Sequence, residues 1–195
     1  WWLFRTRDFI PEYDKIYCVS EPVRKQVIAR FPELADRTEV LLNFIDIKQV
    51  QRRSEEPLSD PQYTGELKFL TVGRASEEKG YDIAVQITAE LKKRGLCFKW
   101  FIIGDGRDLN KLRTMAKEYQ VEQEIIFLGM RENPAPYVKS CDLDLQPSRH
   151  EGYPITIVEA RSLQKVIIAS DIPSMREQIR DGENGYLCPL DVMQF

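Results

Sequence analysis

From residue 67 onward, strand-type segments alternate with helix-type segments, and this alternation restricts the possible folds more than any other feature of the chain. Alternation of this kind predicts an α/β fold with a doubly wound parallel sheet. Because crossovers between parallel strands are right-handed, few other connections of such units are possible. Doubly wound sheets bind their ligands at the carboxyl ends of the strands. The expected strands are 67–72, 98–103, 125–128, 143–146, 166–169 and 185–187, and the expected helices are 81–94, 109–120, 136–140, 154–162 and 173–180.

The first 47 residues are predicted to form a separate part. A strand at 14–20, a helix from Glu21 to about Phe31 and a strand at 38–42 indicate a small βα unit. The polar stretch 48–66 is predicted to be a linker with a single helical turn. At 195 residues the chain can hold one domain and a piece of another. The opening Trp-Trp-Leu-Phe-Arg lacks the features of a signal peptide, so we expect a chain entered midway.

Composition excludes several classes of protein. Hydrophobic residues at 43% and charged residues at 30% are ordinary for a soluble α/β protein, and no apolar run is long enough to predict a membrane span. The formal net charge of −3 argues against a general nucleic-acid surface, so no nucleic-acid partner is expected. The four cysteines show no Cys-x-x-Cys spacing and His150 is the only histidine, so no metal site is predicted.

The cysteines also bear on the compartment. Cys18, Cys97 and Cys188 lie in apolar runs and are predicted to be buried thiols in a reducing compartment, which favours the cytoplasm. Cys97 and Cys141 are interpreted as core residues rather than nucleophiles, because no cationic activator adjoins either. His150 is interpreted as part of a pocket wall, since no Ser or Cys partner for a triad is evident.

Two glutamates, Glu151 and Glu159, flank a predicted helix start in the run Glu-Gly-Tyr-Pro-Ile-Thr-Ile-Val-Glu. Pro154 suits the first turn of a helix, which places Glu151 in the entry loop and Glu159 about a turn and a half inside. The helix start favours phosphate, and ionised carboxylates accept hydrogen bonds from sugar hydroxyls. The pattern predicts a sugar-nucleotide site with both acids at one cleft. The alternative is a helix N-terminal carboxylate and an unrelated surface glutamate.

A second cluster follows the strand that ends at residue 72. Gly73, Arg74, Lys79 and Gly80 place two cations and two glycines at the carboxyl end of that strand. Arg offers a fork of donors to phosphate, Lys offers a mobile charge, and glycine lets the backbone approach closely. The loop is therefore a candidate diphosphate site. The alternative is a solvated loop in which Lys79 pairs with one of the two preceding glutamates.

Two further strands also run into glycine turns, at Gly104 and Gly129. The run after Ile103 lacks the third glycine of a dinucleotide fingerprint, which disfavours NAD. Gly104 is consistent with a backbone approach to a nucleotide or with a plain βα connection. The residues that follow Gly129, namely Met130 and Arg131, are placed to border a base.

Taken in order, these motifs resemble the retaining glycosyltransferases of family four, which have the GT-B architecture of two Rossmann-like domains. The motifs are Val-Gly-Arg, Glu-Lys-Gly, Ile-Gly-Asp-Gly, Phe-Leu-Gly, Pro-Ser-Arg-His-Glu-Gly-Tyr-Pro, Glu-Ala and Asp-Gly-Glu-Asn-Gly, and the likeness covers 13–191. The resemblance implies that 1–47 is the end of the first domain with the interdomain connection. It implies that 48–195 is the C-terminal domain that binds the nucleotide sugar.

The resemblance also assigns roles. Arg74, Lys79 and Glu151 would be catalytic: the two cations would bind the donor diphosphate, and Glu151 would contact the transferred sugar. Glu159 would hold the ribose. The remaining donor-binding positions would be Gly73, Gly104, Gly129, Met130, Arg131, Gly152, Tyr153, Pro154 and Ile155. Fixed positive charge would stabilise the leaving group, so neither metal nor cofactor is expected. Gln164 and Val166 replace the family's usual Gly and Pro, which puts the turn there in doubt.

The resemblance implies transfer of a hexose from a nucleoside-diphosphate sugar, of UDP or GDP type, with retention. The setting would be polysaccharide or glycoconjugate biosynthesis. A sugar or lipid-linked acceptor would bind through the first domain, and a lipid-linked acceptor would bring the full enzyme to the inner membrane face as a peripheral protein. By itself this chain is expected to bind donor without turning it over. The alternatives are a nucleotide-sugar epimerase and a catalytically silent nucleotide-sugar-binding module.

Overall fold

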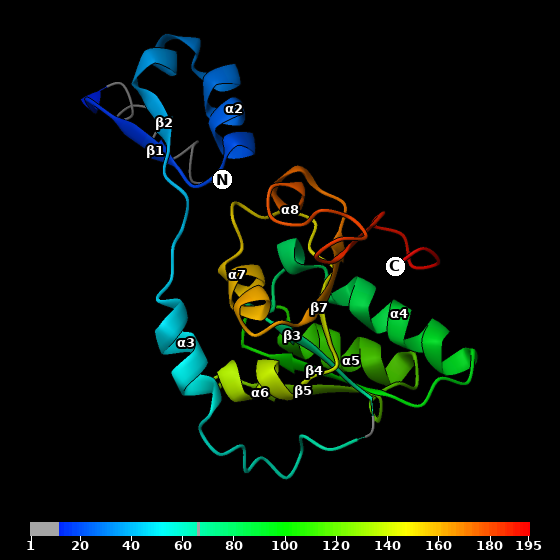
Figure 1. Ribbon diagram of the computed structural model, residues 1–195. Helices are drawn as coiled ribbons and strands as arrows, with labels where there is room; N and C mark the ends of the chain where they lie inside the picture. The colour runs from blue at the N-terminus through cyan, green and yellow to red at the C-terminus, as the bar shows by residue number, and fades with distance from the viewer. Residues whose placement is uncertain (1–11, 66) are drawn as a thin grey trace. The chain divides into compact units, whose positions relative to one another are not determined.

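A computed structural model describes residues 12–65 and 67–195 (Figure 1). The chain divides into two compact units, Trp1–Phe44 and Ile45–Phe195, and each is described by itself. The opening residues, on which the expectation of a chain entered midway rests, lie outside the described residues.

The described part of the first unit is the expected βα unit. Strands β1 (Ile16–Cys18) and β2 (Thr38–Val40) pair in parallel. Between them lie helix α2 (Glu21–Arg30) and the 3-10 helix η2 (Pro32–Arg37). The Ser20 hydroxyl caps α2 by accepting the N–H of Val23 at 3.4 Å. The small core of this unit consists of Cys18, Val27, Phe31 and Leu34.

The second unit is a six-stranded sheet with helices on both faces. The strand order is β5-β4-β3-β6-β7-β8, and every pair is parallel, which confirms the predicted doubly wound sheet. The strands are β3 (Lys68–Val72), β4 (Lys99–Ile103), β5 (Ile125–Gly129), β6 (Leu143–Gln146), β7 (Val166–Ser170) and β8 (Tyr186–Cys188). The helices are α3 (Ile47–Ser54), the 3-10 helix η3 (Glu77–Lys79), α4 (Tyr81–Lys93), α5 (Leu109–Glu118), α6 (Ala135–Ser140), α7 (Ile155–Ser162) and α8 (Pro173–Arg176).

Two apolar layers hold this sheet. One face packs against α4 and α5, and the other packs against α6 and α7 (Figure 1). Trp100 of β4 is fully buried in the first layer, and its indole N–H donates to the Thr71 hydroxyl at 2.9 Å, so this large ring leaves no polar atom unpaired. The central strands β3, β4 and β6 are largely buried on both faces, as expected for a parallel sheet covered by helices.

Two elements differ from the sequence prediction. The stretch predicted as a linker with one helical turn contains the eight-residue helix α3. Asp46 caps it by accepting the N–H of Gln49 at 3.0 Å, and α3 lies against α6 and α7. The helix predicted to run to residue 180 ends at Arg176. The Arg180 N–H donates instead to the side chain of Asn184 at 2.7 Å, which turns the chain into the next loop.

The prediction of buried thiols is correct for only one of its three cysteines. Cys18 is buried, but Cys188 is only partly buried and Cys97 is exposed. Cys97 lies between the end of α4 and the start of β4, so its apolar neighbours belong to a surface connection. Cys141, which was also expected in the core, is buried beside α6. No helix among the described residues is long and apolar enough to cross a membrane.

Candidate functional site

The loops that carry the candidate site residues meet at the carboxyl edge of the sheet. Because the strands are parallel, the loops after β3, β4, β5 and β6 all leave from this edge. Backbone hydrogen bonds join the first three of them. Gly73 donates to the carbonyl of Ile103 at 2.9 Å, Ala75 donates to that of Asp105 at 3.0 Å, and Gly104 donates to that of Gly129 at 2.9 Å. The glycines predicted at strand ends therefore hold neighbouring loops together.

Lys79 and Glu151, which come from different motifs, form an ion pair at this edge. The distance from Lys79 Nζ to Glu151 Oε1 is 2.7 Å, and the side chains are 21% and 9% exposed. The buried Ser148 hydroxyl also donates to Glu151 Oε1, at 2.7 Å. The alternative pairing of Lys79 with a glutamate of its own loop is not what the structure shows.

Glycine makes the position of Lys79 possible. Helix η3 ends at Lys79, and its C-cap residue Gly80 has a φ of +66°, which suits glycine. A Cβ at Gly80 would lie 1.9 Å from the carbonyl oxygen of Pro147. A Cβ at Gly73 would lie 3.4 Å from Lys79 Cε and 2.9 Å from the Tyr81 hydroxyl. The loop after β3 thus lies directly against the loop after β6, and the stem of Lys79 passes over Gly73.

Arg74 lies one residue beyond Gly73, with an exposed side chain. Its charge is among the influences that lower the pKa of the Glu78 carboxyl, after hydrogen bonds from the backbone N–H of Glu78 and from Ser76. The exposed side chain is therefore accessible to a ligand that approaches this edge. Tyr81 is almost completely buried, and its hydroxyl has no hydrogen-bond partner among the described residues.

Glu159 lies on α7, on the side that faces α3 and α6. Pro154 is the N-cap of this helix, so α7 begins one residue later than predicted. Burial raises the pKa of Glu159, and the nearby charge of Arg53 acts in the opposite direction. Glu159 lines a cavity of about 240 Å³ together with Asp46, the N-cap residue of α3, Arg53 of α3 and Asn133 of the loop after β5. Glu151 is not among the residues that line this cavity.

The loop after β5 contains the residues predicted to border a base. Gly129 has a φ of +74°, and Met130 is 70% exposed. The Arg131 guanidinium contacts Asp60 Oδ2 at 2.7 Å and the Tyr137 hydroxyl at 3.0 Å, and it also donates to the Leu128 carbonyl. The hydrogen bond to Asp60 is the main cause of the raised pKa of Arg131.

Gly152 and Tyr153 are half-buried, Pro154 is buried and Ile155 is exposed, so the predicted pocket lining is accessible in part. His150 is exposed, and its backbone N–H donates to the Glu78 carbonyl at 3.2 Å. Among the described residues no group of three or more His, Cys, Asp or Glu side chains is arranged to hold a metal ion.

The family model described as glycosyl transferases group 1 matches residues 53–192 of this chain. The chain belongs to this family. Curated relatives of this group 1 member include an uncharacterized glycosyltransferase of Methanocaldococcus jannaschii, 29% identical over 183 residues. A second is the N-acetylgalactosamine-N,N'-diacetylbacillosaminyl-diphospho-undecaprenol 4-alpha-N-acetylgalactosaminyltransferase of Campylobacter jejuni, 26% identical over 183 residues. They align with 91% and 93% of this chain but with only 43% and 48% of their own lengths. The chain spans about half the length of these relatives.

Solved structures, one of them a galactosyltransferase, share the fold of this group 1 member, which confirms the expected half of a GT-B architecture. A mutant of Staphylococcus aureus TarM aligns with a TM-score of 0.79 at 19% identity, over 95% of this chain and 36% of its own. Anabaena HepE, in complex with UDP, aligns with a TM-score of 0.76 at 20% identity, over 90% and 50%. The lipopolysaccharide outer core galactosyltransferase WaaB aligns with a TM-score of 0.68 at 29% identity, over 92% and 50%.

Sequence reasoning missed several polar residues that contact or adjoin the candidate site residues. Ser148 donates to Glu151, yet a serine three residues before a glutamate gives no specific signal. Asp60 lies in the stretch predicted to be a linker, and nothing in the sequence around it indicates that its carboxylate pairs with Arg131. Asp144 is buried on β6, and burial raises its pKa to about 7. The Leu-Asp-Leu-Gln run does signal a carboxylate within a buried strand, but it does not reveal how Asp144 is paired.

Proposed function

We propose that this chain is the donor-binding half of a retaining glycosyltransferase that transfers a hexose from a nucleoside-diphosphate sugar to an acceptor. The observation that carries the proposal is the Lys79–Glu151 pair, 2.7 Å apart at the carboxyl edge of the sheet. Arg74 and Gly73 lie at the same edge. Family membership supports a transferase.

A bound donor would rearrange this ion pair. The donor diphosphate competes with Glu151 for the Lys79 ammonium, and the exposed Arg74 adds a second cation with a forked set of donors. Once released from Lys79, the Glu151 carboxylate can accept hydrogen bonds from the hydroxyls of the transferred sugar. The same cations would then stabilise charge on the departing diphosphate. This assignment requires neither a divalent metal nor a cofactor.

The nucleoside would extend towards α7 and the loop after β5. Glu159 is proposed to hold the ribose, and Met130 to border the base, because they line or adjoin that end of the domain. Backbone groups of residues 152–155, together with those of Gly104 and Gly129, would complete the donor pocket. UDP is the first nucleotide to test, since Anabaena HepE is known in complex with UDP and with UDP-glucose.

The names of relatives support a role in polysaccharide or glycoconjugate biosynthesis. They include a putative colanic acid biosynthesis glycosyltransferase of Escherichia coli and the alpha-monoglucosyldiacylglycerol synthase of Streptococcus pneumoniae. A sugar or lipid-linked acceptor is proposed to bind through a part of the protein other than this half. With a lipid-linked acceptor, the whole enzyme would work in the cytoplasm at the inner membrane face, as a peripheral protein.

The proposal is tested by the thermal stability of this chain with UDP, GDP, ADP and NAD at millimolar concentration. Ligand at about one hundred times its dissociation constant stabilises a protein by about 2.7 kcal/mol. One nucleoside diphosphate is expected to raise the midpoint, and NAD is not. The double variant Arg74→Ala with Lys79→Ala should unfold as a domain like the wild type but lose the nucleotide effect. Unchanged affinity in that variant would overturn the assignment.

Lys92→Ala is the matched control, because Lys92 lies near the end of α4 and pairs with Glu124 at the opposite edge of the sheet. It should retain the nucleotide effect. The complete protein then separates the activities: transfer requires donor and acceptor together, whereas an epimerase would rearrange the donor sugar without an acceptor. Binding of donor without either reaction would indicate a silent module.

A further inference from the structure

Arg149 ties the loop that carries Glu151 to the turn that carries Lys79. We infer that Arg149, held by Asp82, is a positioning residue for the donor site, because it sets the distance between those two side chains. The inference rests on the function proposed above.

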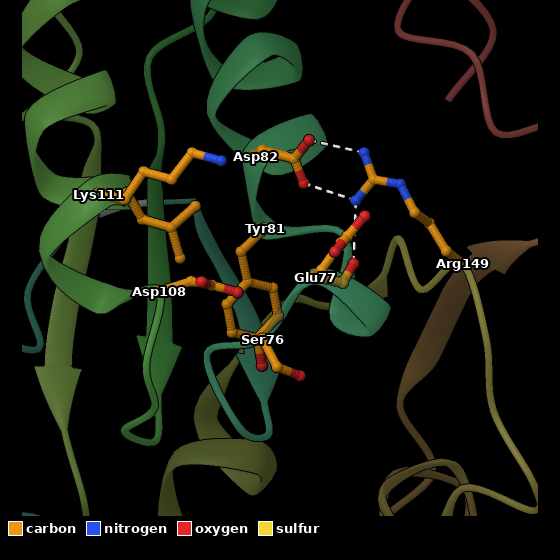
Figure 2. A pocket seen from close by; sticks show the side chains of 8 residues that line it. Ser76, Glu77, Tyr81, Asp82, Asp108, Lys111 and Arg149 are labelled. Atoms are coloured by element: carbon orange, nitrogen blue, oxygen red, sulfur yellow. Dashed lines mark hydrogen bonds and ion pairs between the residues drawn. The ribbon is translucent and has the colours of Figure 1, made fainter. Parts of the chain in front are cut away.

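The side chains of Arg149 and Asp82 form a bidentate ion pair. Nη1 and Nη2 each lie 2.6 Å from a different carboxylate oxygen, so the planar fork meets both (Figure 2). Asp82 lies in the first turn of α4. Burial pushes the pKa of Asp82 upward, but hydrogen bonding and charge from Arg149 outweigh it, and the pKa ends below its ordinary value. The pair borders a cavity of about 220 Å³ that also contacts Ser76 and Lys111.

Arg149 also holds the backbone of η3 directly. Its Nη1 donates to the Glu77 carbonyl at 3.0 Å, and its backbone N–H donates to the Glu78 carbonyl at 2.8 Å. The next residue, His150, donates to the same Glu78 carbonyl at 3.2 Å. Lys79 follows Glu78 immediately, and Glu151 follows His150 immediately. These contacts therefore hold the backbone immediately before Lys79 and immediately before Glu151.

The side-chain pair can be removed without removing the two backbone hydrogen bonds to the Glu78 carbonyl. The Arg149 and Asp82 side chains are 29% and 32% exposed, so solvent screens this pair in part and its removal costs less folding free energy than removal of a fully buried pair. Position is more sensitive than stability, because small displacements of binding groups cost much of their effect on a bound reactant. A positioning role therefore predicts weakened diphosphate binding in a domain that is nearly as stable as the wild type.

The test compares Arg149→Gln, Asp82→Asn and Arg149→Lys with the wild-type chain. Titration calorimetry measures the affinity for the nucleoside diphosphate that stabilises the wild type most, and NMR titration measures the affinity for the matching nucleoside. Denaturant unfolding measures stability. Glu124→Gln is the control, since it removes an ion pair between two separate segments at the opposite edge of the sheet.

Arg149→Gln and Asp82→Asn are each expected to weaken nucleoside-diphosphate binding at least tenfold. Nucleoside binding should stay within about twofold, and the unfolding midpoint should shift no more than in Glu124→Gln. Arg149→Lys keeps the charge but loses the fork, so its affinity should fall between those of wild type and Arg149→Gln. The double variant should bind no more weakly than Arg149→Gln alone, because that substitution already removes the whole ion pair with Asp82.

Two results would overturn the inference alone: unchanged diphosphate affinity in Arg149→Gln, or an equal loss for diphosphate and nucleoside, which marks general damage to the fold. A wild-type chain that binds no nucleoside diphosphate would overturn the proposed function, and this inference with it.

Discussion

Two regions at the carboxyl edge of the sheet use the same residue types differently. The paired loops, residues 73–80 and 147–154, bring Lys79 to Glu151. The β5 loop, residues 129–134, brings Arg131 to Asp60 of the segment that precedes β3. Each contact is an ion pair of 2.7 Å. Each loop also contains a glycine with positive φ, Gly80 or Gly129.

The difference lies in what else holds each cation. Arg131 also contacts the Tyr137 hydroxyl and a backbone carbonyl, and Tyr137 in turn donates to Asp60 at 2.9 Å. Lys79 has Glu151 as its single partner within the described part of the chain. A cation with one exchangeable partner can be released to a ligand more easily than a cation held by several partners. Residue type and strand-end position alone do not distinguish these two arrangements.

The largest expected effect comes from exchanging the two glycines for alanine. Gly80→Ala should lower the free energy of unfolding by about 3 kcal/mol, because an L-residue with positive φ is strained and the new Cβ would meet the Pro147 carbonyl. Gly129→Ala has the same backbone strain but no heavy atom within 4 Å of its Cβ, so about 1 kcal/mol is expected. Urea unfolding of both variants measures the contrast, and equal losses would show that the two loops do not differ in packing.

The second prediction concerns one acid from each region, Asp144 and Asp60, whose contributions to the free energy of unfolding should depend on pH in opposite directions. Burial raises the pKa of Asp144, on the strand that leads into the paired loops, to about 7. The folded chain therefore binds an extra proton from about pH 4 to 7. The protonated Asp144 carboxyl therefore contributes to the stability of the folded chain. This contribution is fully present below the unfolded pKa of the carboxyl and is lost as the pH rises through 7. The free energy of unfolding of the wild type should decline between pH 5 and 8, and Asp144→Asn should make that decline smaller by about 2 kcal/mol.

Asp60 should show the opposite dependence. Burial raises the pKa of Asp60, but hydrogen bonds from Arg131, Gln62 and Tyr137 outweigh it and leave the pKa below its ordinary value. Its contribution is therefore present above about pH 4 and is lost as the pH falls through the folded pKa. Unfolding curves of wild type, Asp144→Asn and Asp60→Asn across pH test both signs. A wild-type stability that did not fall from pH 5 to 8 relative to Asp144→Asn would show that Asp144 is ionised in the folded chain.

A third prediction removes the cation from each region. Arg131→Gln should lower the free energy of unfolding by about 1.5 kcal/mol, because Asp60 and Tyr137 lose a shared partner. Its affinity for the nucleoside diphosphate should stay within about threefold. Lys79→Gln should show the opposite pattern. Its loss of unfolding free energy should be smaller than that of Arg131→Gln, because Ser148 still donates to Glu151, but it should lose diphosphate binding. Calorimetric titration measures the diphosphate affinity of both variants, and urea unfolding measures their stability. If both variants lost affinity and stability to the same extent, the two regions would not differ in function.

The sequence predicted the fold well because the relevant signals are local. Apolar runs, helix caps and glycine turns located all six strands of the second unit and most of its helices. The site was predicted as loops at one edge, because parallel strands require it. The partners were not predictable: Lys79 had glutamates beside it, but it pairs with one 72 positions away. Cys97 was misplaced because apolar neighbours do not reveal that a connection lies at the surface.

The smallest expected effect on stability concerns Met130, which adjoins Arg131 but has a 70% exposed side chain. Met130→Ala should change the free energy of unfolding by less than about 0.5 kcal/mol, as is usual for exposed positions. If Met130 borders the base, the same variant should weaken binding of the nucleoside a few-fold, because a thioether packs favourably against an aromatic ring. Inorganic pyrophosphate binding should not change, since it depends on the paired loops. An effect on pyrophosphate as large as that on the nucleoside would place Met130 at the diphosphate end and join the two regions into one binding surface.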